Sequence, residues 1–369
     1  MLALRDGRPI PDDGYHGAYV ADLAAELPRD VQERADAGDA ADAARVVGSW
    51  AAERVRVGIE ASLQHLGVRF DVWKTEGSLH DEGWVERAGE RLRTCGHLYK
   101  QDGATWFRSI AFGGDNDLVI YRADGRPTYF AADIGYVTEK FSRGFDHLIY
   151  VWGADHHGTV ARNRNAAEAM GYDKAAVEML LIAWVRFVQD GQEISMSKRS
   201  GEFITLDELL AEVGVDAARW FFASRAHTTG IDFDIELAKK QSNENPVYYV
   251  QYAHARISSI LRRAVDVGLA PAGSLSGGLA GDPVALGLAR DVLRLPDVIE
   301  DAVAAKETQG ITAYATELAT TFHAFYRDRR VVDANDPQSS ATRLALVDAT
   351  RVTLANTLRV LGISAPESM

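Results

Sequence analysis

The spacing of apolar residues divides the chain into helical and strand-like segments. From residue 40 to about residue 66, apolar residues recur at helical spacing in an alanine-rich background, which predicts a helix that ends at Gly67. Residues 68–73 (VRFDVW) then alternate between apolar and polar and predict a strand. Residues 79 to about 92 predict a second helix, so the first hundred residues contain mainly helix.

A glycine- and aspartate-rich segment follows at residues 97–130. Its apolar runs have the length of strands, and three turn signals separate them: Asp102-Gly103, Gly113-Gly114 and Asp124-Gly125. This arrangement predicts an antiparallel meander.

Strands then alternate with helices. The pattern predicts a helix at about 130–142, a strand at 147–153, a helix at about 157–170 and a strand-like run at 177–188. Such alternation is typical of a parallel, doubly wound α/β sheet, whose ligand site lies at the carboxyl ends of the strands. Two polar segments, VWGADHHG (151–158) and SMSKRSG (195–201), stand at such ends.

Helix caps mark the next part of the chain. Thr205 with Glu208 three residues later forms a predicted capping box, and a further helix is expected to begin at about Asp216. Residues 227–245 are polar and rich in turn formers, and they predict a hinge between domains.

The last third of the chain predicts helices alone. Asn245 is placed to cap a helix whose first residue is Pro246. A glycine-rich linker at 268–283 separates that helix from three more segments with apolar residues at helical spacing. Residues 246–369 therefore predict an all-α helical bundle.

Composition narrows the class of protein. The chain has 369 residues, 47% hydrophobic and 25% charged, which is typical of a soluble protein large enough for two domains. Its net charge of −13 argues against unspecific nucleic-acid binding, although a local basic face remains compatible with it. With a single cysteine, Cys95, no signal-peptide pattern at the start and no long apolar run, we expect a cytoplasmic protein.

The loop after the last predicted strand carries candidate catalytic side chains. Lys198 is a flexible cation that can follow a phosphate, Ser197 and Ser200 offer hydroxyl groups, and Gly201 lets the backbone turn. The loop can be a phosphate-binding strap or an ordinary solvated turn. Its place between an apolar strand and a capping box favours the strap.

A second candidate site opens the helix at 130–142. Tyr129 and Asp133 are four residues apart and therefore lie on one helical face. A carboxylate beside a phenol suits a guanidinium ligand, which pairs with carboxylates through two parallel hydrogen bonds. The alternative is an aspartate that stabilises the helix dipole near its amino terminus.

A third candidate site follows the strand at 147–153. Gly153 precedes Asp155, His156 and His157, and their position at a sheet end favours contacts with a nucleotide. An Asp-His-His triplet also occurs in metal phosphoesterases. That alternative requires further clustered aspartates, and no second aspartate pair stands at another predicted strand end.

Two groups of side chains in the helical part could contact RNA. Tyr248, Tyr252 and Arg256 share one helical face, which suits stacking on bases, although tyrosines at this spacing also pack in cores. A later cluster offers either phosphate contacts or a solvated helix end: Arg327, Arg329 and Arg330.

Together these segments resemble arginyl-tRNA synthetases, which are class I aminoacyl-tRNA ligases. The resemblance extends over nearly the whole chain and is carried by DGYHGAYVADLA, TYFAADIGY, VWGADHHG, MSKRSG, VGVDAARWFF, SNENPVYYVQYAHARISSIL and LRVLGISAPESM. It implies part of a class I Rossmann-like catalytic domain with a parallel sheet at residues 1–240. An all-α, DALR-type anticodon-binding domain would follow at 246–369.

The resemblance also implies a reaction and its participants. Arginine and ATP, with Mg²⁺ accompanying the ATP and no structural metal, would form arginyl-adenylate, and arginine would pass to tRNA(Arg). The loop residues Met196, Ser197 and Lys198 would form the catalytic signature, with Lys198 stabilising pyrophosphate. The other implied contacts are Tyr129, Asp133 and Asp155 with arginine, Gly153, Asp155, His156 and Lys198 with ATP, and Tyr248, Tyr252, Arg256 and Met369 with tRNA.

The chain departs from the family pattern in the signature loop. Ser195 stands where the family usually has its first signature lysine, and Arg199 stands where its last serine often stands. Because Lys198 is retained, we expect weakened rather than abolished contacts with phosphate.

A larger departure concerns the ATP site. The His-x-Gly-His element of class I enzymes is absent from residues 1–369. We therefore expect a carboxyl-terminal portion with little or no activity alone, which comes either from a fragmented or mis-started gene or from a split enzyme whose other half is a separate polypeptide. Its uncovered sheet edge predicts poor solubility or association. The alternatives are a non-catalytic tRNA-binding or interaction module and an Asp-His-His metal phosphoesterase.

Overall fold

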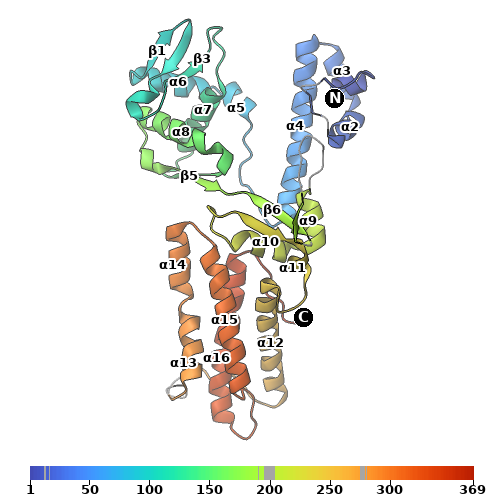
Figure 1. The fold of residues 1–369 in the computed structure, drawn as a ribbon, viewed down its shortest axis with the longest axis vertical. Coiled ribbons are helices and arrows are strands. Elements are labelled where there is room, and N and C mark those ends of the chain that lie inside the picture. The colour runs from blue at the N-terminus through green and yellow to red at the C-terminus, as the bar shows by residue number, and fades with distance from the viewer. Residues whose placement is uncertain (12–13, 16, 190, 195–203, 275–278, 280) are drawn as a thin grey trace. The chain divides into compact units, whose positions relative to one another are not determined.

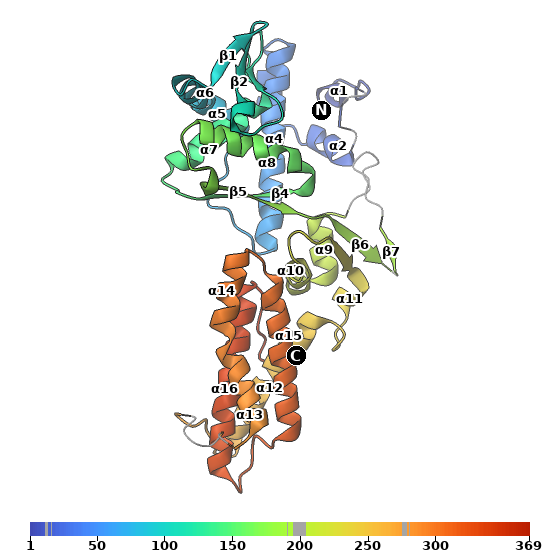
Figure 2. The ribbon, with the colours of Figure 1, turned by 60° about the vertical axis from the view of Figure 1, so that its left-hand side comes forward.

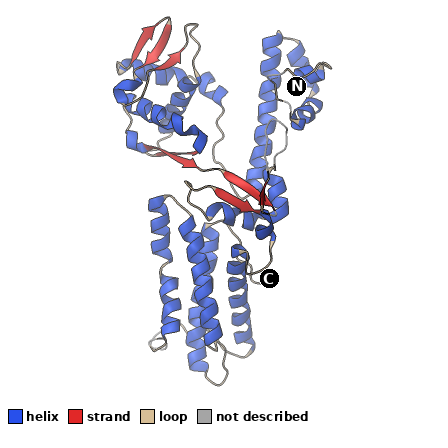
Figure 3. Ribbon diagram, viewed as in Figure 1, coloured by secondary structure: helices blue, strands red, loops and turns tan. Residues whose placement is uncertain are grey.

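The computed structural model describes residues 1–11, 14–15, 17–189, 191–194, 204–274, 279 and 281–369 (Figure 1). Contacts between residues divide the chain into two compact units. The larger unit contains residues 1–69, 186–226 and 232–369, and the smaller unit contains residues 70–185 and 227–231. Helices predominate in both units, and the strands are short (Figure 3).

The smaller unit begins with two helices and an antiparallel sheet. Helix α5 (Glu76–Asp81) ends two residues before Gly83, whose positive φ of 74° lets the chain turn into α6 (Trp84–Thr94). Three antiparallel strands follow, β1 (Leu98–Gln101), β2 (Ala104–Phe107) and β3 (Leu118–Tyr121), with the short helix η1 (Ser109–Phe112) before β3. This confirms the predicted meander and its first turn at Asp102-Gly103.

The alternating part of the smaller unit also agrees with the sequence. Helix α7 (Tyr129–Ser142) leads to strand β4 (Leu148–Gly153), and the short helix η2 (Ala154–His156) leads to α8 (His157–Ala169). After η3 (Lys174–Ala176), strand β5 (Val177–Ile182) pairs with β4 in parallel. The predicted parallel sheet is therefore confirmed, with two strands in the described part of the chain.

The core of the smaller unit holds these elements together. Ile134 and Val137 of α7 are fully buried against Val85 and Leu92 of α6 and against Ile120 of β3. On β4 the side chains alternate, so Ile149 and Val151 are exposed, with 49% and 64% of their surface accessible. The association that the sequence predicts for such an apolar face stays a prediction.

The larger unit begins with four helices. Helices α1 (Leu2–Arg5), α2 (Ala18–Ala25) and α3 (Arg29–Asp36) precede the long α4 (Ala40–His65), which Asp39 caps. A small apolar cluster joins α3 to the first half of α4 through Val31, Ala35 and Val47. The helix predicted from residue 40 to Gly67 is confirmed.

A small sheet and three helices connect this region to the carboxyl-terminal helices. Strands β6 (Val185–Gln189), β7 (Gln192–Glu193) and β8 (Ile231–Asp234) form a sheet in the order β7-β6-β8. Helix α9 (Leu206–Val213) begins with the predicted Thr205–Glu208 capping box. Helices α10 (Val215–Ala223) and α11 (Ile235–Lys239) complete this part.

Within the described part of residues 246–369, five helices form the carboxyl-terminal bundle. They are α12 (Pro246–Asp266), α13 (Pro283–Leu293), α14 (Leu295–Ala305), α15 (Gln309–Asp328) and α16 (Pro337–Val360). Figures 1 and 2 show them side by side from two directions, and α15 contacts each of the other four. Phe322, Phe325 and Leu354 are fully buried in the bundle.

Hydrogen bonds of two polar side chains fix the end of the bundle. The guanidinium of Arg219 donates to the backbone carbonyls of Leu66 at 2.9 Å and Leu361 at 2.8 Å. These carbonyls belong to the C-cap residues that directly follow α4 and α16, where helices leave such groups unsatisfied. Asp216 accepts from the backbone of Ser364 at 3.1 Å and from Gln251 at 2.8 Å, which anchors the terminal segment.

The structure corrects several elements predicted from sequence. Residues 68–73 form no strand, because the backbone N–H of Val68 closes the end of α4 by donating to Leu63, and Phe70 and Val72 are exposed. The helix predicted at 79–92 is two helices, since Gly83 interrupts it. The run 177–188 is likewise two strands, separated at Ala183 and Trp184.

Two further findings concern the carboxyl-terminal half. The polar segment 227–245 contains the strand β8 and the helix α11, which begins at an Asp234 cap, and its predicted role as a hinge between domains stays a prediction. Four helices, rather than three, follow the linker at 268–283. The reason is that Pro296 stands in the first turn of α14 and begins a new helix directly after α13.

Candidate functional site

The first turn of α7 places the two predicted arginine-site residues. The hydroxyl of Thr128 caps this helix by accepting from Ala131. Tyr129 is its first residue and is 76% exposed, while Asp133 follows one turn later with a side chain that is 31% exposed. The phenol and the carboxylate therefore lie on one helical face, as the sequence predicted.

Asp133 forms an ion pair that the sequence did not predict. Arg162 of α8 donates from Nη2 to Oδ2 of Asp133 at 3.2 Å. Burial raises the pKa of the Asp133 carboxyl above its usual value, and the charge and hydrogen bond of Arg162 oppose that rise. Glu76 raises the same pKa and His156 lowers it, so these groups also face Asp133 electrostatically.

The end of β4 positions the third predicted group. A Cβ atom on Gly153 would lie 2.5 Å from Oδ1 of Asp155, so the turn after the strand requires glycine while Asp155 keeps this position. The side chains of Asp155 and His156 are each 56% exposed, and Oδ2 of Asp155 lies 3.8 Å from Nε2 of His156. Because the charge of His156 also lowers the pKa of Asp133, the end of β4 and the first turns of α7 lie near one another in the smaller unit.

The structure does not describe the predicted loop residues. Met196, Ser197, Lys198 and the substituted positions Ser195 and Arg199 lie outside the described residues. Their predicted roles stay predictions. The sequence alone relates Lys198 to the arginine site.

The predicted RNA-contacting residues of α12 belong to a larger aromatic surface. The rings of Tyr248 and Tyr252 are stacked with centroids 6.4 Å apart, and the guanidinium of Arg256 lies 5.8 Å from the Tyr252 ring. We call the aromatic face the group formed by Tyr248, Tyr249, Tyr252, Arg256, His323 and Tyr326, the last two from α15. Tyr249, His323 and Tyr326 were not predicted from the sequence, although the three-residue spacing of the last two indicates a shared helical face.

The carboxyl-terminal segment is anchored to α12. His254 lies with Nδ1 2.8 Å from the carbonyl oxygen of Pro366, and Arg262 donates to the carbonyl of Glu367 at 3.1 Å. Met369 at the end of this segment is 52% exposed. In the late arginine cluster, Arg329 makes two hydrogen bonds to Asp282.

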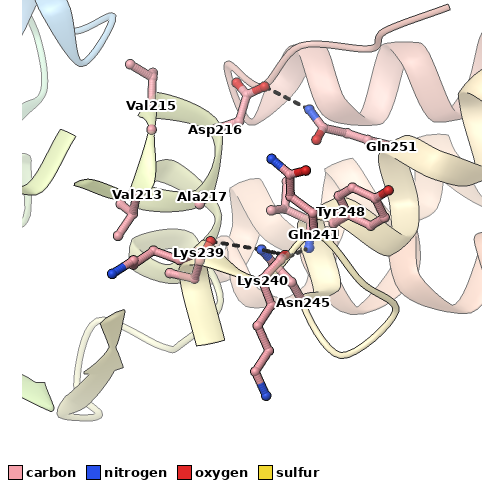
Figure 4. A pocket seen from close by; sticks show the side chains of 13 residues that line it. Val213, Val215, Asp216, Ala217, Lys239, Lys240, Gln241, Asn245, Tyr248 and Gln251 are labelled. Atoms are coloured by element: carbon pink, nitrogen blue, oxygen red, sulfur yellow. Dashed lines mark hydrogen bonds between the residues drawn. The ribbon is translucent and has the colours of Figure 1, made fainter. Parts of the chain in front are cut away.

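A cavity of about 350 Å³ lies beside the first turn of α12 (Figure 4). Helices α10, α11 and α12 line it, and the hydrogen bond from Gln251 to Asp216 crosses one side. Tyr248 contributes one wall, so the cavity adjoins the aromatic face. Lys239 and Lys240 also line it, but each forms a salt bridge with a glutamate.

Among the titratable groups of the aromatic face, His323 has the pKa that differs most from its ordinary value. Burial, and then the positive charge of Arg256, lower its pKa from 6.5 to about 4. Its Nε2 atom is buried and makes no hydrogen bond with any described residue. His323 is therefore neutral at physiological pH.

This shift predicts a specific pH dependence of stability. Because the unfolded chain binds a proton at His323 below pH 6.5 and the folded chain only below about 4, folding stability falls as the pH drops through this window. We expect His323→Phe to lose about 1 kcal/mol less of its free energy of unfolding than wild type over this pH window. The value is smaller than the full pKa shift implies, because His323 is partly exposed to solvent. Urea unfolding at pH 7 and pH 4.5 measures it, with exposed His65→Gln as the control. If wild type and His323→Phe lost the same free energy of unfolding between pH 7 and pH 4.5, the prediction would be contradicted.

Within the described ranges, no group of three or more His, Cys, Asp or Glu side chains is arranged to hold a metal ion. None of the helices that the structure describes combines the length and the apolar character of a membrane span.

Comparisons with family models define the class of protein. Residues 49–229 match the model for the catalytic domain of class I tRNA synthetases (R), and residues 250–369 match the DALR anticodon binding domain. The chain is therefore built from the catalytic and anticodon-binding domains of a class I aminoacyl-tRNA synthetase.

Curated proteins and solved structures identify the family. The chain is 46% identical to the arginine–tRNA ligase of Moorella thermoacetica and 45% identical to that of Desulforudis audaxviator. Each match includes 100% of this chain and 66% of the relative. A Campylobacter jejuni structure assigned as an arginyl-tRNA synthetase has 31% identity and a TM-score of 0.86, over 100% of this chain and 80% of that one. The chain belongs to the arginyl-tRNA synthetase family.

A more distant structure supports the fold. The Thermus thermophilus arginyl-tRNA synthetase superposes with a TM-score of 0.73 at 23% identity, over 88% of this chain and 66% of that one. The predicted class I fold with its helical anticodon-binding domain is thus confirmed, as is the family of aminoacyl-tRNA ligases. The chain spans about two thirds of the length of its curated relatives.

Proposed function

We propose that the chain is the part of an arginine–tRNA ligase that holds arginine, binds the phosphates of ATP and grips tRNA(Arg). The reaction joins arginine to ATP as arginyl-adenylate, releases pyrophosphate, and then transfers arginine to the tRNA. The observation that carries the proposal is the match of the whole chain to curated arginine–tRNA ligases at 46% and 45% identity. A cytoplasmic location, where tRNA is charged, goes with this function.

In the proposed site, Asp133 receives the guanidinium of arginine. A carboxylate is the acceptor that a guanidinium matches geometrically, and the half-buried position of Asp133 strengthens the attraction. Tyr129 borders the same face with its phenol, and Asp155, exposed after β4, would add a second carboxylate. Discrimination against lysine would follow, since an ammonium is a point charge and cannot make the planar contact.

ATP would lie at the carboxyl end of β4. Gly153 lets the backbone approach a nucleotide closely, while Asp155 and His156 offer polar contacts from η2. Lys198, with Met196 and Ser197, would stabilise pyrophosphate as negative charge develops on it. Mg²⁺ would accompany ATP as part of the substrate.

The aromatic face would bind the tRNA. Tyr248 and Tyr252 present stacked rings at the surface of α12, and unpaired bases stack readily on such rings. Arg256 adds a cation beside them, and Met369 ends an anchored segment near α12. The strong negative charge of the whole chain makes a local surface of this kind necessary for RNA binding.

Arginylation of tRNA tests the proposal in two arms. Residues 1–369 are assayed alone and as a fused enzyme, in which the part of the M. thermoacetica relative that precedes the match is joined to Met1. We expect robust arginylation by the fused enzyme and little by residues 1–369 alone, because the latter contain no His-x-Gly-His sequence. Adding a separate polypeptide that contains the His-x-Gly-His element to residues 1–369 should restore arginylation as the fusion does.

Either arm can contradict the proposal. An inactive fused enzyme that still binds tRNA(Arg) would favour the non-catalytic RNA-binding module. Rapid turnover by residues 1–369 alone would show that the ATP site needs no further element. A stoichiometric transition metal in the purified protein would revive the phosphoesterase alternative.

A further inference from the structure

Arg162 is a guanidinium that already contacts the carboxylate proposed to bind arginine. Its Nη2 atom lies 3.2 Å from Oδ2 of Asp133. The other carboxylate oxygen, Oδ1, makes no hydrogen bond with any described residue. A carboxylate can accept two parallel hydrogen bonds from one fork and still more from other donors, so one resident cation leaves room for a second.

The setting of Arg162 fixes where its guanidinium lies. It projects from α8, which packs on α7, and lies 5.7 Å from the buried ring of Phe130 in the first turn of α7. Its Nε atom is buried and unpartnered among the described residues, so the contact with Asp133 is made from the end of the guanidinium alone. The side chain is 36% exposed and is therefore only partly desolvated.

We propose that Arg162 is a positioning residue of the arginine site, which keeps Asp133 ionised and holds Oδ2 so that Oδ1 faces the incoming substrate. The inference rests on the proposed function, because it assumes that Asp133 receives arginine. It assigns to Arg162 a role that acts through Asp133 and requires no contact with the substrate.

The charges around Asp133 explain why a resident cation is needed. Burial and Glu76 of α5 favour the protonated carboxyl, while Arg162 of α8 and His156 of η2 favour the carboxylate. The neutral phenol of buried Tyr150 in β4 also lies within electrostatic range. Without Arg162, burial and Glu76 would raise the pKa of Asp133 further, and Asp133 would take up a proton at higher pH.

The consequence for binding has a definite sign. Arginine remains a cation at all pH values near neutrality, so its binding follows the ionised fraction of Asp133. Raising the pKa of Asp133 moves the loss of affinity to higher pH, whereas affinity on the alkaline plateau changes less. A purely structural role would lower affinity equally at every pH.

The test uses the fused enzyme with three substitutions: Arg162→Gln, Arg162→Lys and, as a matched ion-paired control in the same unit, Arg126→Gln. Arginine affinity is measured by calorimetry between pH 4.5 and 8. We expect Arg162→Gln to shift the midpoint of the pH profile upward by about one unit, because an opposite charge this close lowers a carboxyl pKa by at least that much. Arg162→Lys should retain most of the wild-type profile, and Arg126→Gln all of it.

A second measurement separates this inference from the proposed function. Carbon-13 spectra of aspartate-labelled protein report the titration of Asp133 directly, with Asp133→Asn to assign the signal, and need no arginine. An unchanged titration in Arg162→Gln overturns the inference. A shifted titration in a protein whose arginine affinity does not depend on Asp133 overturns the assignment of the site to arginine, and with it the role of Arg162 there.

Discussion

Asp133→Asn is expected to weaken arginine binding by the fused enzyme about a hundredfold at pH 7.5. The substitution keeps the size and shape of the side chain but removes its charge. A hydrogen bond to a charged group contributes about 1.5–3 kcal/mol, and about 1.4 kcal/mol corresponds to a tenfold change in affinity. One such contact through Oδ1, near the upper end of this range, accounts for the expected factor. Calorimetric titration with arginine measures it.

The control for this prediction is Asp124→Asn. Asp124 forms a salt bridge with Arg126 on an exposed turn of the same unit, so its substitution tests for unspecific effects of charge loss. Thermal unfolding of both variants shows whether the fold is preserved. We expect the affinity for ATP to be unchanged in Asp133→Asn. An arginine affinity within threefold of wild type would refute the role of Asp133.

Elements that depend on local chemistry could be predicted from the sequence. The capping box of Thr205 and Glu208, the Asn245–Pro246 helix start and the Asp102-Gly103 turn each involve residues within a few positions of one another. The alternation of α7, β4, α8 and β5 followed from apolar spacing in the same way. For such features the backbone preference and the tertiary structure agree.

Features that depend on distant parts of the chain could not be predicted. The segment at 68–73 has a strand pattern, but a strand needs a paired neighbour, and the structure instead uses its first N–H to end α4. The Arg162–Asp133 contact joins residues 29 positions apart on two helices, and only their packing brings them together. The aromatic face likewise combines α12 with α15.

The candidate site was predicted unevenly for the same reason. Tyr129 and Asp133 share one helix, so their common face could be derived from spacing. Asp155 and His156 follow the end of a strand, which general rules for parallel sheets place near a ligand. The electrostatic link between His156 and Asp133, in contrast, appears only once β4 and α7 have packed into one core.

Lys198→Ala is expected to slow the formation of arginyl-adenylate by the fused enzyme by a factor of about a hundred to a thousand. Removing one group that stabilises developing charge typically costs this much. The effect should be near the upper end here, since Ser195 replaces the first signature lysine and leaves Lys198 as the one retained. Arginine-dependent exchange of pyrophosphate into ATP measures the step without tRNA.

This prediction is specific to Lys198 because the substitution should lower the rate of adenylate formation and leave the affinity for arginine almost unchanged. Pyrophosphate leaves only after arginine has bound, so Lys198→Ala should leave the affinity for arginine within about threefold of wild type, whereas Asp133→Asn changes that affinity most. Lys100→Ala, on the exposed strand β1, serves as the control because it removes a lysine from a surface remote in sequence from the loop. If Lys198→Ala exchanges pyrophosphate as fast as this control, the lysine has no part in the chemistry and the loop is an ordinary turn.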